Sequence, residues 1–420
     1  MIQRIFKLFQ AQIKAPWICC QIGAREDYAV PRALHQSKQL LSLITDAWVL
    51  PDSPINYLPF AAIKPLKERF HPELSSANVQ AITFDLGRFE LIQKTFKSNS
   101  WQRTIARNQW FQKKALVQLS KIAKEINDTI TSGTSRPTLF AYSYAALDLL
   151  RFAKEQGWQT ILGQIDPGIV EEQIMKAEYE RYPIYRNAWN PAPESYWENW
   201  REECSLADKI LVNSSWSAKA LQKAGINTEK IRIIPLAYEP SISPSNCQRT
   251  YPLTFNYDRP LKALFLGQVI LRKGIMALLE AAQYLQDQPI EFWFVGQSEI
   301  NFAHINQPNI HWIGSVPRSE VSRYYQEADV FLFPTLSDGF GLTQLEAQTW
   351  KLPLIVSSFC GEVVQDNING LILPEVTGNT LAEKLLFCLE NPDYLNQLSQ
   401  HSKDTSRFNL ARLRTSLQSL

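Results

Sequence analysis

The stretch that most restricts the fold of this 420-residue chain runs from Phe331 to Ser358. It consists of an apolar segment, a glycine-containing turn, an amphipathic stretch and a second apolar segment: Phe331–Pro334, Asp338–Gly341, about Leu342–Trp350 and Leu354–Val356. Two buried strands on either side of an amphipathic helix are typical of a βαβ unit in a parallel sheet. We therefore predict an α/β fold in which this unit belongs to a parallel sheet.

Two acidic residues lie on either side of the turn. Asp338 opens the turn, and Glu346 falls about one turn into the helix, with seven residues between them. The first N–H groups of a helix have no intrahelical partner, and the helix dipole favours an anion there. Carboxylates would repel a bare phosphate, but they accept hydrogen bonds from sugar hydroxyls. The arrangement therefore indicates a ligand that combines phosphate with sugar.

The rest of the chain alternates strand-like and helical segments. In the first half we predict strands at Trp17–Ile22, Leu41–Val49, Val79–Asp85, Thr138–Tyr142, Gln159–Gln164 and Lys209–Asn213, and helices at Val30–Leu41, Gln102–Asp128 and Ala145–Glu155. After Pro240–Pro252, which is rich in Ser and Pro, we predict a strand at Leu261–Leu266 and a helix at Ile275–Tyr284. This alternation favours parallel sheets with helices on both faces. The Ser- and Pro-rich segment is interpreted as a linker between two domains.

Composition excludes several classes of protein. The net charge of +2 gives no reason to expect a nucleic-acid partner. The six cysteines have no metal-ligand spacing, which favours reduced thiols in the cytoplasm. No run approaches the roughly 18–20 apolar residues of a membrane span, and no signal peptide is evident. Residues 1–15 place apolar side chains on one helical face with basic residues elsewhere, which fits peripheral contact with a membrane or packing on the protein itself.

The turn and its two acids resemble the E-x7-E signature of family-4 glycosyltransferases, which are retaining enzymes of the GT-B fold. Asp338 stands at the first acidic position and Glu346 at the second. Two further segments are similar to the family, the sequences ADKILVNS from Ala207 and KIRIIPLA from Lys230. The specific similarity extends from about Ala207 to Asn409, whereas the preceding part is similar only in its architecture.

The resemblance implies a GT-B architecture, with two Rossmann-like doubly wound parallel-sheet domains facing a cleft. We predict an acceptor-side domain at residues 1–245 and a nucleotide-sugar-binding domain at residues 246–408. The amphipathic tail, residues 409–420, is expected to cross back to the first domain.

The resemblance also implies roles for individual residues. Arg272 and Lys273 would bind the donor diphosphate, assisted by the N–H groups at Gly341, Leu342 and Thr343. A planar donor fork next to a point charge suits a pyrophosphate.

In the same scheme, Glu346 would accept hydrogen bonds from the ribose hydroxyls and Asp338 from those of the sugar. Gly267 and the backbone at Val316 would lie beside the nucleotide. No Asp-x-Asp sequence occurs, so we expect no metal ion and no cofactor besides the donor.

The chain departs from the family pattern at two places. Family members often carry a histidine near the transferred sugar, but none occurs here between His71 and His304. Asp166 or Gln164 could take that place, the role could be vacant, or Asp166 could be an ordinary turn residue. The usual glycine pair is replaced by Ser358-Phe359.

Two features of the sequence have more than one interpretation. Tyr179–Trp200 is rich in aromatic residues, which fits either an acceptor-binding surface or a packed helical hairpin. Lys351 stands where relatives commonly have glycine, just before Leu352-Pro353. We predict a positive φ at Lys351, because the helix must end before the proline.

Together these features predict a glycosyltransferase that moves a sugar from a nucleoside-diphosphate sugar to a sugar, lipid-linked or small-molecule acceptor with retention of configuration. One alternative is a catalytically silent nucleotide-sugar sensor or partner scaffold. A GT-B-like epimerase or phosphorylase is a further alternative. Turnover of the donor in the presence of an acceptor separates the transferase from the sensor.

Overall fold

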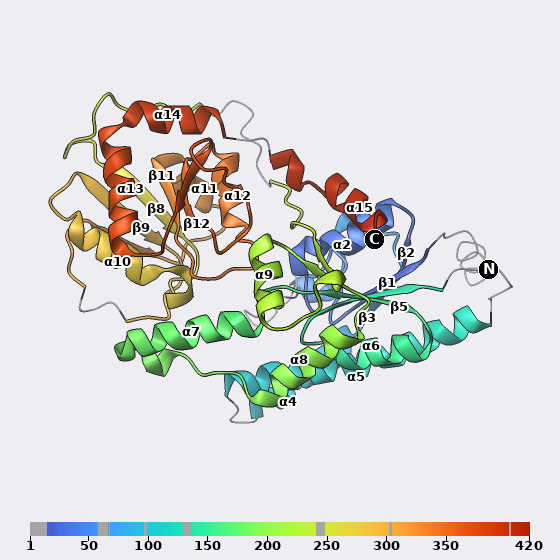
Figure 1. The fold of residues 1–420 in the computed structure, drawn as a ribbon. Helices are drawn as coiled ribbons and strands as arrows, with labels where there is room; N and C mark the ends of the chain where they lie inside the picture. Colours follow the sequence, from blue (N-terminus) through green and yellow to red (C-terminus); the bar gives the residue numbers. More distant parts are fainter. Residues whose placement is uncertain are drawn as a thin grey trace.

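The computed structural model describes residues 15–57, 66, 68–95, 99–128, 136–240, 248–301, 305–402 and 405–420. Among these residues the strands form two sheets, one in each lobe of the molecule (Figure 1). The first sheet has the order β3-β2-β1-β4-β5-β6-β7 and the second β10-β9-β8-β11-β12-β13. Strand pairs within both sheets are parallel. The prediction of two Rossmann-like, doubly wound domains is therefore confirmed.

The first sheet is formed by β1 (Trp17–Gln21), β2 (Leu40–Thr45), β3 (Val79–Ala81), β4 (Thr138–Tyr142), β5 (Gln159–Gly163), β6 (Lys209–Val212) and β7 (Ile231–Ile233). Its helices are α2 (Ala29–Gln36), α4 (Thr83–Thr95), α5 (Ser100–Asn127), α6 (Leu147–Glu155), α7 (Ile169–Arg181), α8 (Glu194–Leu206) and α9 (Ser215–Lys223). In Figure 1, α5, α6 and α8 cover one face of the sheet and α2 the other. Every residue of β1, β2 and β4 is buried, as expected for strands covered on both faces.

The second sheet is formed by β8 (Leu261–Leu266), β9 (Ile290–Val295), β10 (Ile310–Gly314), β11 (Val330–Phe333), β12 (Leu354–Ser357) and β13 (Gly370–Leu373). The helices around it are α10 (Ile275–Tyr284), α11 (Val321–Glu327), α12 (Thr343–Thr349), α13 (Gly378–Glu390) and α14 (Pro392–Gln400). The predicted βαβ unit is β11-α12-β12, whose two strands pair in parallel. This unit therefore lies at the centre of the second domain.

The C-terminal helix α15 (Leu410–Gln418) packs against α2 of the first domain, where Figure 1 also places the C-terminus. Leu410, Leu413 and Leu417 are buried in the same apolar cluster as Trp17 and Tyr28. The chain thus returns to the first domain. The predicted boundary between residues 245 and 246 lies outside the described residues and stays a prediction.

Three predicted segments of the first domain were wrong in their extent. The strand predicted at Val79–Asp85 ends at Ala81, and α4 begins at Thr83, whose Oγ accepts a hydrogen bond from the Trp48 N–H at 3.1 Å. The strand predicted at Leu41–Val49 ends at Thr45, and the helix predicted to reach Leu41 ends at Gln36.

The earlier ends of α2 and β2 each have a structural cause. After α2 the chain turns back through Lys38, which has a φ of 58°, and so enters β2 directly. After β2, the buried Asp46 carboxylate accepts a hydrogen bond from the Gly23 N–H at 2.8 Å and pairs with Arg107 at 3.0 Å. These polar contacts at Asp46 replace the continuation of the strand.

The predicted end of α12 is confirmed. Lys351 has a φ of 51°. Its N–H donates to the Gln348 carbonyl at 2.9 Å, and the N–H of Leu352 donates to the Ala347 carbonyl at 3.1 Å. This pair of bonds is the Schellman arrangement that ends many helices.

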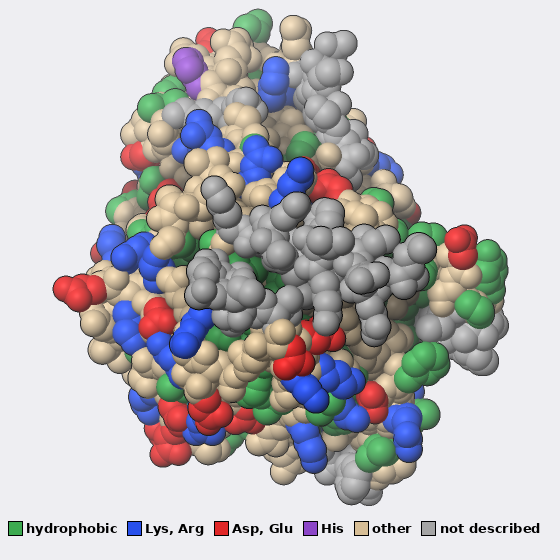
Figure 2. Space-filling model, turned by 90° about the vertical axis from the view of Figure 1, so that its right-hand side faces the viewer, with side chains coloured by type: hydrophobic (Ala, Val, Ile, Leu, Met, Phe, Trp, Pro, Cys, Tyr) green, Lys and Arg blue, Asp and Glu red, His purple; other side chains and the backbone are tan. Residues whose placement is uncertain are grey.

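On the face that Figure 2 presents, Lys and Arg side chains of the described residues are interspersed with Asp and Glu side chains. Five cysteines of the described chain are buried and free. Within the described residues, no helix is both long and apolar enough to span a bilayer. The membrane contact predicted for residues 1–15 falls almost entirely outside the described residues.

Candidate active site

The turn between β11 and α12 is built from glycines that other residues could not replace. A Cβ on Gly341, which has a φ of 85°, would lie 2.5 Å from the Phe333 ring. A Cβ on Gly339 would lie 2.3 Å from the Ile165 carbonyl oxygen, which belongs to the first domain. The absence of a side chain at Gly339 therefore lets the backbones of the two domains touch beside Asp338.

The basic pair predicted to bind diphosphate faces this turn. Arg272 and Lys273 lie in a short 3-10 turn that ends at Gly274, where a Cβ would lie 1.8 Å from the Pro334 carbonyl oxygen. The Arg272 guanidinium donates to the Ser337 carbonyl at 2.8 Å and lies 3.6 Å from the Asp338 carboxylate. Lys273 donates to the same carboxylate. The structure therefore brings together Arg272, Lys273 and Asp338, the residues to which the resemblance assigned the diphosphate and the sugar of the donor.

The electrostatics of this cluster keep Asp338 ionised. Its side chain is 14% exposed, and that of Lys273 is 13% exposed. Burial alone would raise the pKa of Asp338, but the charges of Lys273 and Arg272 outweigh burial and lower this pKa. Asp338 is thus an anion held between two cations at the carboxyl end of β11.

Sequence reasoning missed Glu171, a residue of the first domain that joins this cluster. Its carboxylate lies 3.6 Å from Arg272 and accepts a hydrogen bond from the Ser337 hydroxyl at 2.8 Å. Burial raises the pKa of Glu171 to about 7, against the opposing charge of Arg272. The available signal was an acid in the first turn of a helix that follows a strand end, after Asp166-Pro167-Gly168. Nothing in the sequence pairs it with Arg272 in the other domain.

Glu346 lies apart from this cluster. It is half-buried on α12 and accepts a hydrogen bond from the Tyr325 hydroxyl of α11 at 2.8 Å. No ion pair joins Glu346 to a cation among the described side chains. Its free oxygen can accept hydrogen bonds from a ligand, and Tyr325 fixes its orientation.

The other predicted binding residues lie where the carboxyl ends of the strands meet. Gly341, Leu342 and Thr343 lead into the N-terminus of α12, whose first N–H groups have no intrahelical acceptor. Gly267 follows β8 and packs closely on Gly296 after β9, where a Cβ would lie 1.8 Å from the Gly267 carbonyl oxygen. Val316 follows β10. All are at the edge where open α/β sheets bind ligands.

The two candidates for the place of the family histidine behave differently. Gln164 is 1% exposed, and its carbonyl oxygen accepts a hydrogen bond from the Trp200 indole at 2.9 Å. Asp166 accepts hydrogen bonds from the Tyr144 hydroxyl at 2.5 Å and from the Gly168 N–H at 2.8 Å. Asp166 is thus a turn residue that also lines a pocket beside Arg272.

This pocket lies between the domains and has a volume of about 230 Å³. Aromatic side chains line much of it, namely Trp101, Tyr144, Tyr179, Trp189, Tyr196 and Trp197, together with Glu171 and Arg272. The Tyr179 and Trp189 rings stack 5.4 Å apart at 7°. The aromatic segment thus spans the end of α7 and most of α8 and contributes residues to this pocket. Whether it binds an acceptor stays a prediction.

Two hydrogen bonds between side chains join the domains. The Trp216 indole at the start of α9 donates to the Ser337 hydroxyl at 3.2 Å, and the Tyr182 hydroxyl donates to Glu280 of α10 at 2.8 Å. These contacts fix the position of the cation cluster relative to the aromatic pocket. No group of three or more His, Cys, Asp or Glu side chains in the described part of the chain is placed to hold a metal ion.

Comparisons with solved structures establish the class of fold. Sucrose-phosphate synthase from Thermosynechococcus elongatus superposes with a TM-score of 0.62 at 15% identity, over 97% of this chain and 98% of that one. Anabaena Alr3699/HepE in complex with UDP superposes with a TM-score of 0.57 at 14% identity, over 97% and 100%. The chain therefore has the GT-B architecture predicted from its sequence.

Sequence comparisons show a resemblance to glycosyltransferases. Residues 254–405 match the family model "Glycosyl transferases group 1". The amylovoran biosynthesis glycosyltransferase AmsK of Erwinia amylovora is 25% identical over 195 residues, which cover 42% of this chain and 46% of that protein. The N,N'-diacetylbacillosaminyl-diphospho-undecaprenol alpha-1,3-N-acetylgalactosaminyltransferase of Campylobacter jejuni is 25% identical over 195 residues, covering 43% and 51%. The chain thus matches about half the length of these relatives. Its predicted resemblance to glycosyltransferases is confirmed, without a narrower subtype.

Proposed function

We propose that the chain is a glycosyltransferase that takes its sugar from a nucleoside-diphosphate donor. The observation that carries the proposal is the half-buried cluster of Arg272, Lys273 and Asp338, in which Arg272 also lines an aromatic pocket between two Rossmann-like domains. Two cations with limited exposure suit a diphosphate, and the aromatic walls suit a sugar. The names of the group 1 relatives, which are glycosyltransferases, support the same reaction.

In this proposal the donor rearranges the ion pairs of the empty site. Lys273 and Arg272 exchange the Asp338 carboxylate for the oxygens of the donor diphosphate. Asp338 then accepts hydrogen bonds from hydroxyls of the sugar. The two cations stabilise the negative charge that develops on the leaving nucleoside diphosphate, an effect often worth several kcal/mol when the donors are preorganised.

The transfer itself moves one glycosyl group. The acceptor oxygen bonds to the anomeric carbon, and the bond from that carbon to the diphosphate oxygen breaks with its electron pair going to the diphosphate. The acceptor proton passes to the departing phosphate or to solvent. Positioning of the two substrates against each other supplies the rest of the acceleration.

The remaining residues bind the nucleotide part of the donor. Glu346, oriented by Tyr325, accepts hydrogen bonds from the ribose hydroxyls. The N–H groups at Gly341–Thr343 contact phosphate oxygens, and the loops at Gly267 and Val316 lie beside the base. We extend the proposal to a family-4-like hexosyltransferase that retains configuration, on the resemblance of the acid-x7-acid unit. A cytoplasmic location is consistent with five free, buried cysteines.

A panel of UDP-, GDP- and ADP-sugars tests the proposal. Thermal-shift measurements identify the donor that the chain binds, and UDP-glucose comes first because HepE has been solved with UDP and glucose. Release of the nucleoside diphosphate is then measured with a mixture of saccharide acceptors. Turnover with transfer to an acceptor is expected. Binding of the donor without consumption would instead indicate the silent sensor.

A further inference from the structure

A second cavity adjoins the aromatic pocket on the side away from Arg272. This outer cavity lies between α5, α6 and α8. Its volume is about 300 Å³, at the lower end of the range for ligand pockets. Tyr144 and Tyr196 line both cavities, and their rings stack 4.9 Å apart at 17°. The two cavities therefore flank one stacked aromatic pair.

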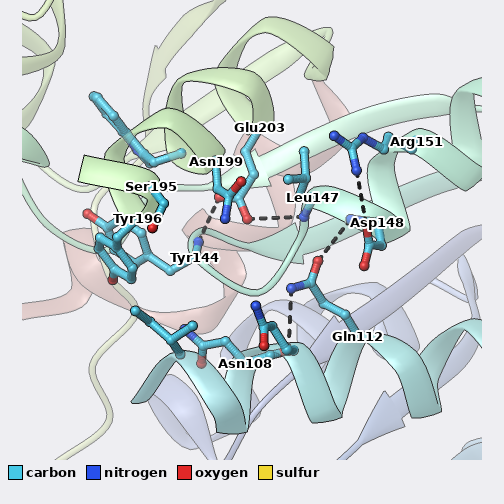
Figure 3. Close-up of a pocket in the computed structure, with 13 residues that line it drawn as sticks. Asn108, Gln112, Tyr144, Leu147, Asp148, Arg151, Ser195, Tyr196, Asn199 and Glu203 are labelled. Carbon is cyan, nitrogen blue, oxygen red and sulfur yellow. Dashed lines mark hydrogen bonds and ion pairs between the residues drawn. The ribbon is translucent and has the colours of Figure 1, made fainter. Parts of the chain in front are cut away.

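The outer cavity is lined by neutral polar side chains on opposite walls. Figure 3 shows Asn108 and Gln112 on α5 facing Ser195, Tyr196 and Asn199 on α8. Among the described residues, no protein group is hydrogen-bonded to the side-chain amides of Asn108 or Asn199. Each amide supplies both donors and acceptors, which suits hydroxyl groups of a ligand.

The charged residues of this cavity are already paired. The Glu203 carboxylate, 1% exposed, accepts hydrogen bonds from the N–H groups of Tyr144, Ala146 and Leu147 at 2.7–3.0 Å. Arg151 pairs with Asp148 at 3.2 Å and with Glu202 at 2.7 Å. No unpaired charge therefore remains among the described lining residues to attract a phosphate or a carboxylate.

We propose that the outer cavity binds the second sugar residue of an uncharged acceptor oligosaccharide, whose terminal residue occupies the aromatic pocket beside Arg272. The rings of Tyr144 and Tyr196 lie where the two residues are linked. This inference rests on the proposed glycosyltransferase function and narrows its acceptor to neutral saccharides of at least two residues. Ring faces bind the apolar sides of sugars, and the amides bind their hydroxyls.

An array of immobilised saccharides, from one to four residues long and either neutral or carboxylated, tests this proposal on the full-length protein. The wild type is expected to bind neutral di- to tetrasaccharides and to bind monosaccharides and carboxylated chains at least tenfold more weakly. Asn108→Ala and Asn199→Ala should each weaken the binding about five- to tenfold, because each loses hydrogen bonds to the ligand. Asn127→Ala on α5 and Glu198→Ala on α8, both exposed and outside the cavity, are the matched controls.

The second part of the test measures binding of UDP, GDP and ADP by calorimetry and the consumption of the corresponding nucleotide sugars. All four variants should bind the nucleotide as the wild type does, because none lies in the donor site. A wild type that consumes the donor but prefers monosaccharides or carboxylated chains overturns the outer site and leaves the transferase standing, as do cavity variants with unchanged binding. A wild type that binds neutral oligosaccharides through Asn108 and Asn199 but consumes no donor supports the site and overturns the transferase.

Discussion

Replacement of Glu171 by Gln should remove a pH dependence from nucleotide binding. Glu171 lies 3.6 Å from Arg272, and its pKa of about 7 divides it between two protonation states at neutral pH. Asp166 and Asp338 are the acids that face it, and Arg272 is the cation. An ionised Glu171 both competes for Arg272 and repels the diphosphate, so binding favours its protonated form.

The size of the effect follows from the repulsion between the Glu171 carboxylate and a phosphate bound to Arg272. A unit charge about 5 Å away at an effective dielectric constant of about 20 costs the ionised carboxylate about 3 kcal/mol. That is enough to keep Glu171 protonated in the complex, so that binding takes up about one proton above pH 7. Below pH 7, Glu171 is already protonated in the free protein, and the affinity for UDP is constant. Above pH 7 the Kd for UDP rises by up to tenfold per pH unit, or about 20-fold between pH 6.5 and 8.5.

Isothermal titration calorimetry of UDP at pH 6.5, 7.5 and 8.5 measures this dependence. Glu171→Gln should bind UDP with the same Kd at all three values, close to that of the wild type at pH 6.5. Glu180→Gln on the exposed side of α7 should behave like the wild type. Ionisation of the UDP phosphate, with a pKa of about 6, acts in the opposite direction and below this window. A wild-type Kd that changes less than twofold, or an equal dependence in Glu171→Gln, would refute the assignment.

Three further predictions concern the acids, the metal and the end of α12. Glu346→Gln should weaken binding of free UDP, whereas Asp338→Asn should mainly weaken binding of the complete nucleotide sugar; equal losses for both ligands would contradict the division between ribose and sugar. Transfer should continue in EDTA, because two cations already face the diphosphate; activity lost in EDTA and restored by Mg²⁺ or Mn²⁺ would show the opposite. Lys351→Gly should leave the urea midpoint unchanged or slightly raised, because relief of the strain of about 1 kcal/mol at a φ of 51° offsets the entropy cost of glycine. A decrease of more than about 1 kcal/mol in the free energy of unfolding would contradict this.

The sequence was sufficient for the fold because strands buried on both faces give continuous apolar segments. β4 was predicted with its observed ends, Thr138–Tyr142, since charged or turn-forming residues flank an apolar run. Segments whose ends depend on distant partners were harder. β2 ends at Asp46, which contacts Gly23 and Arg107, and neither contact has a signal in the local sequence.

The candidate site was predictable where it is local. Asp338, Arg272 and Lys273 were found because each lies in a short motif after a strand, and the fold brings their side chains together. Glu171 was missed because it comes from the first domain and meets Arg272 only through the packing of the two domains. The outer cavity was also invisible, since its amides come from two helices about ninety residues apart in the chain.

The most direct test of the central claim is the rate of sugar transfer by Arg272→Ala and Lys273→Ala, measured as nucleoside diphosphate released per acceptor glycosylated. Each variant removes a charged donor from a partly dehydrated site, so kcat/KM should fall by about 10²-fold or more. Lys223→Ala, on an exposed surface of α9, is the matched control and should retain wild-type activity. Near-wild-type turnover in both active-site variants would contradict the assignment of this cluster to the donor diphosphate.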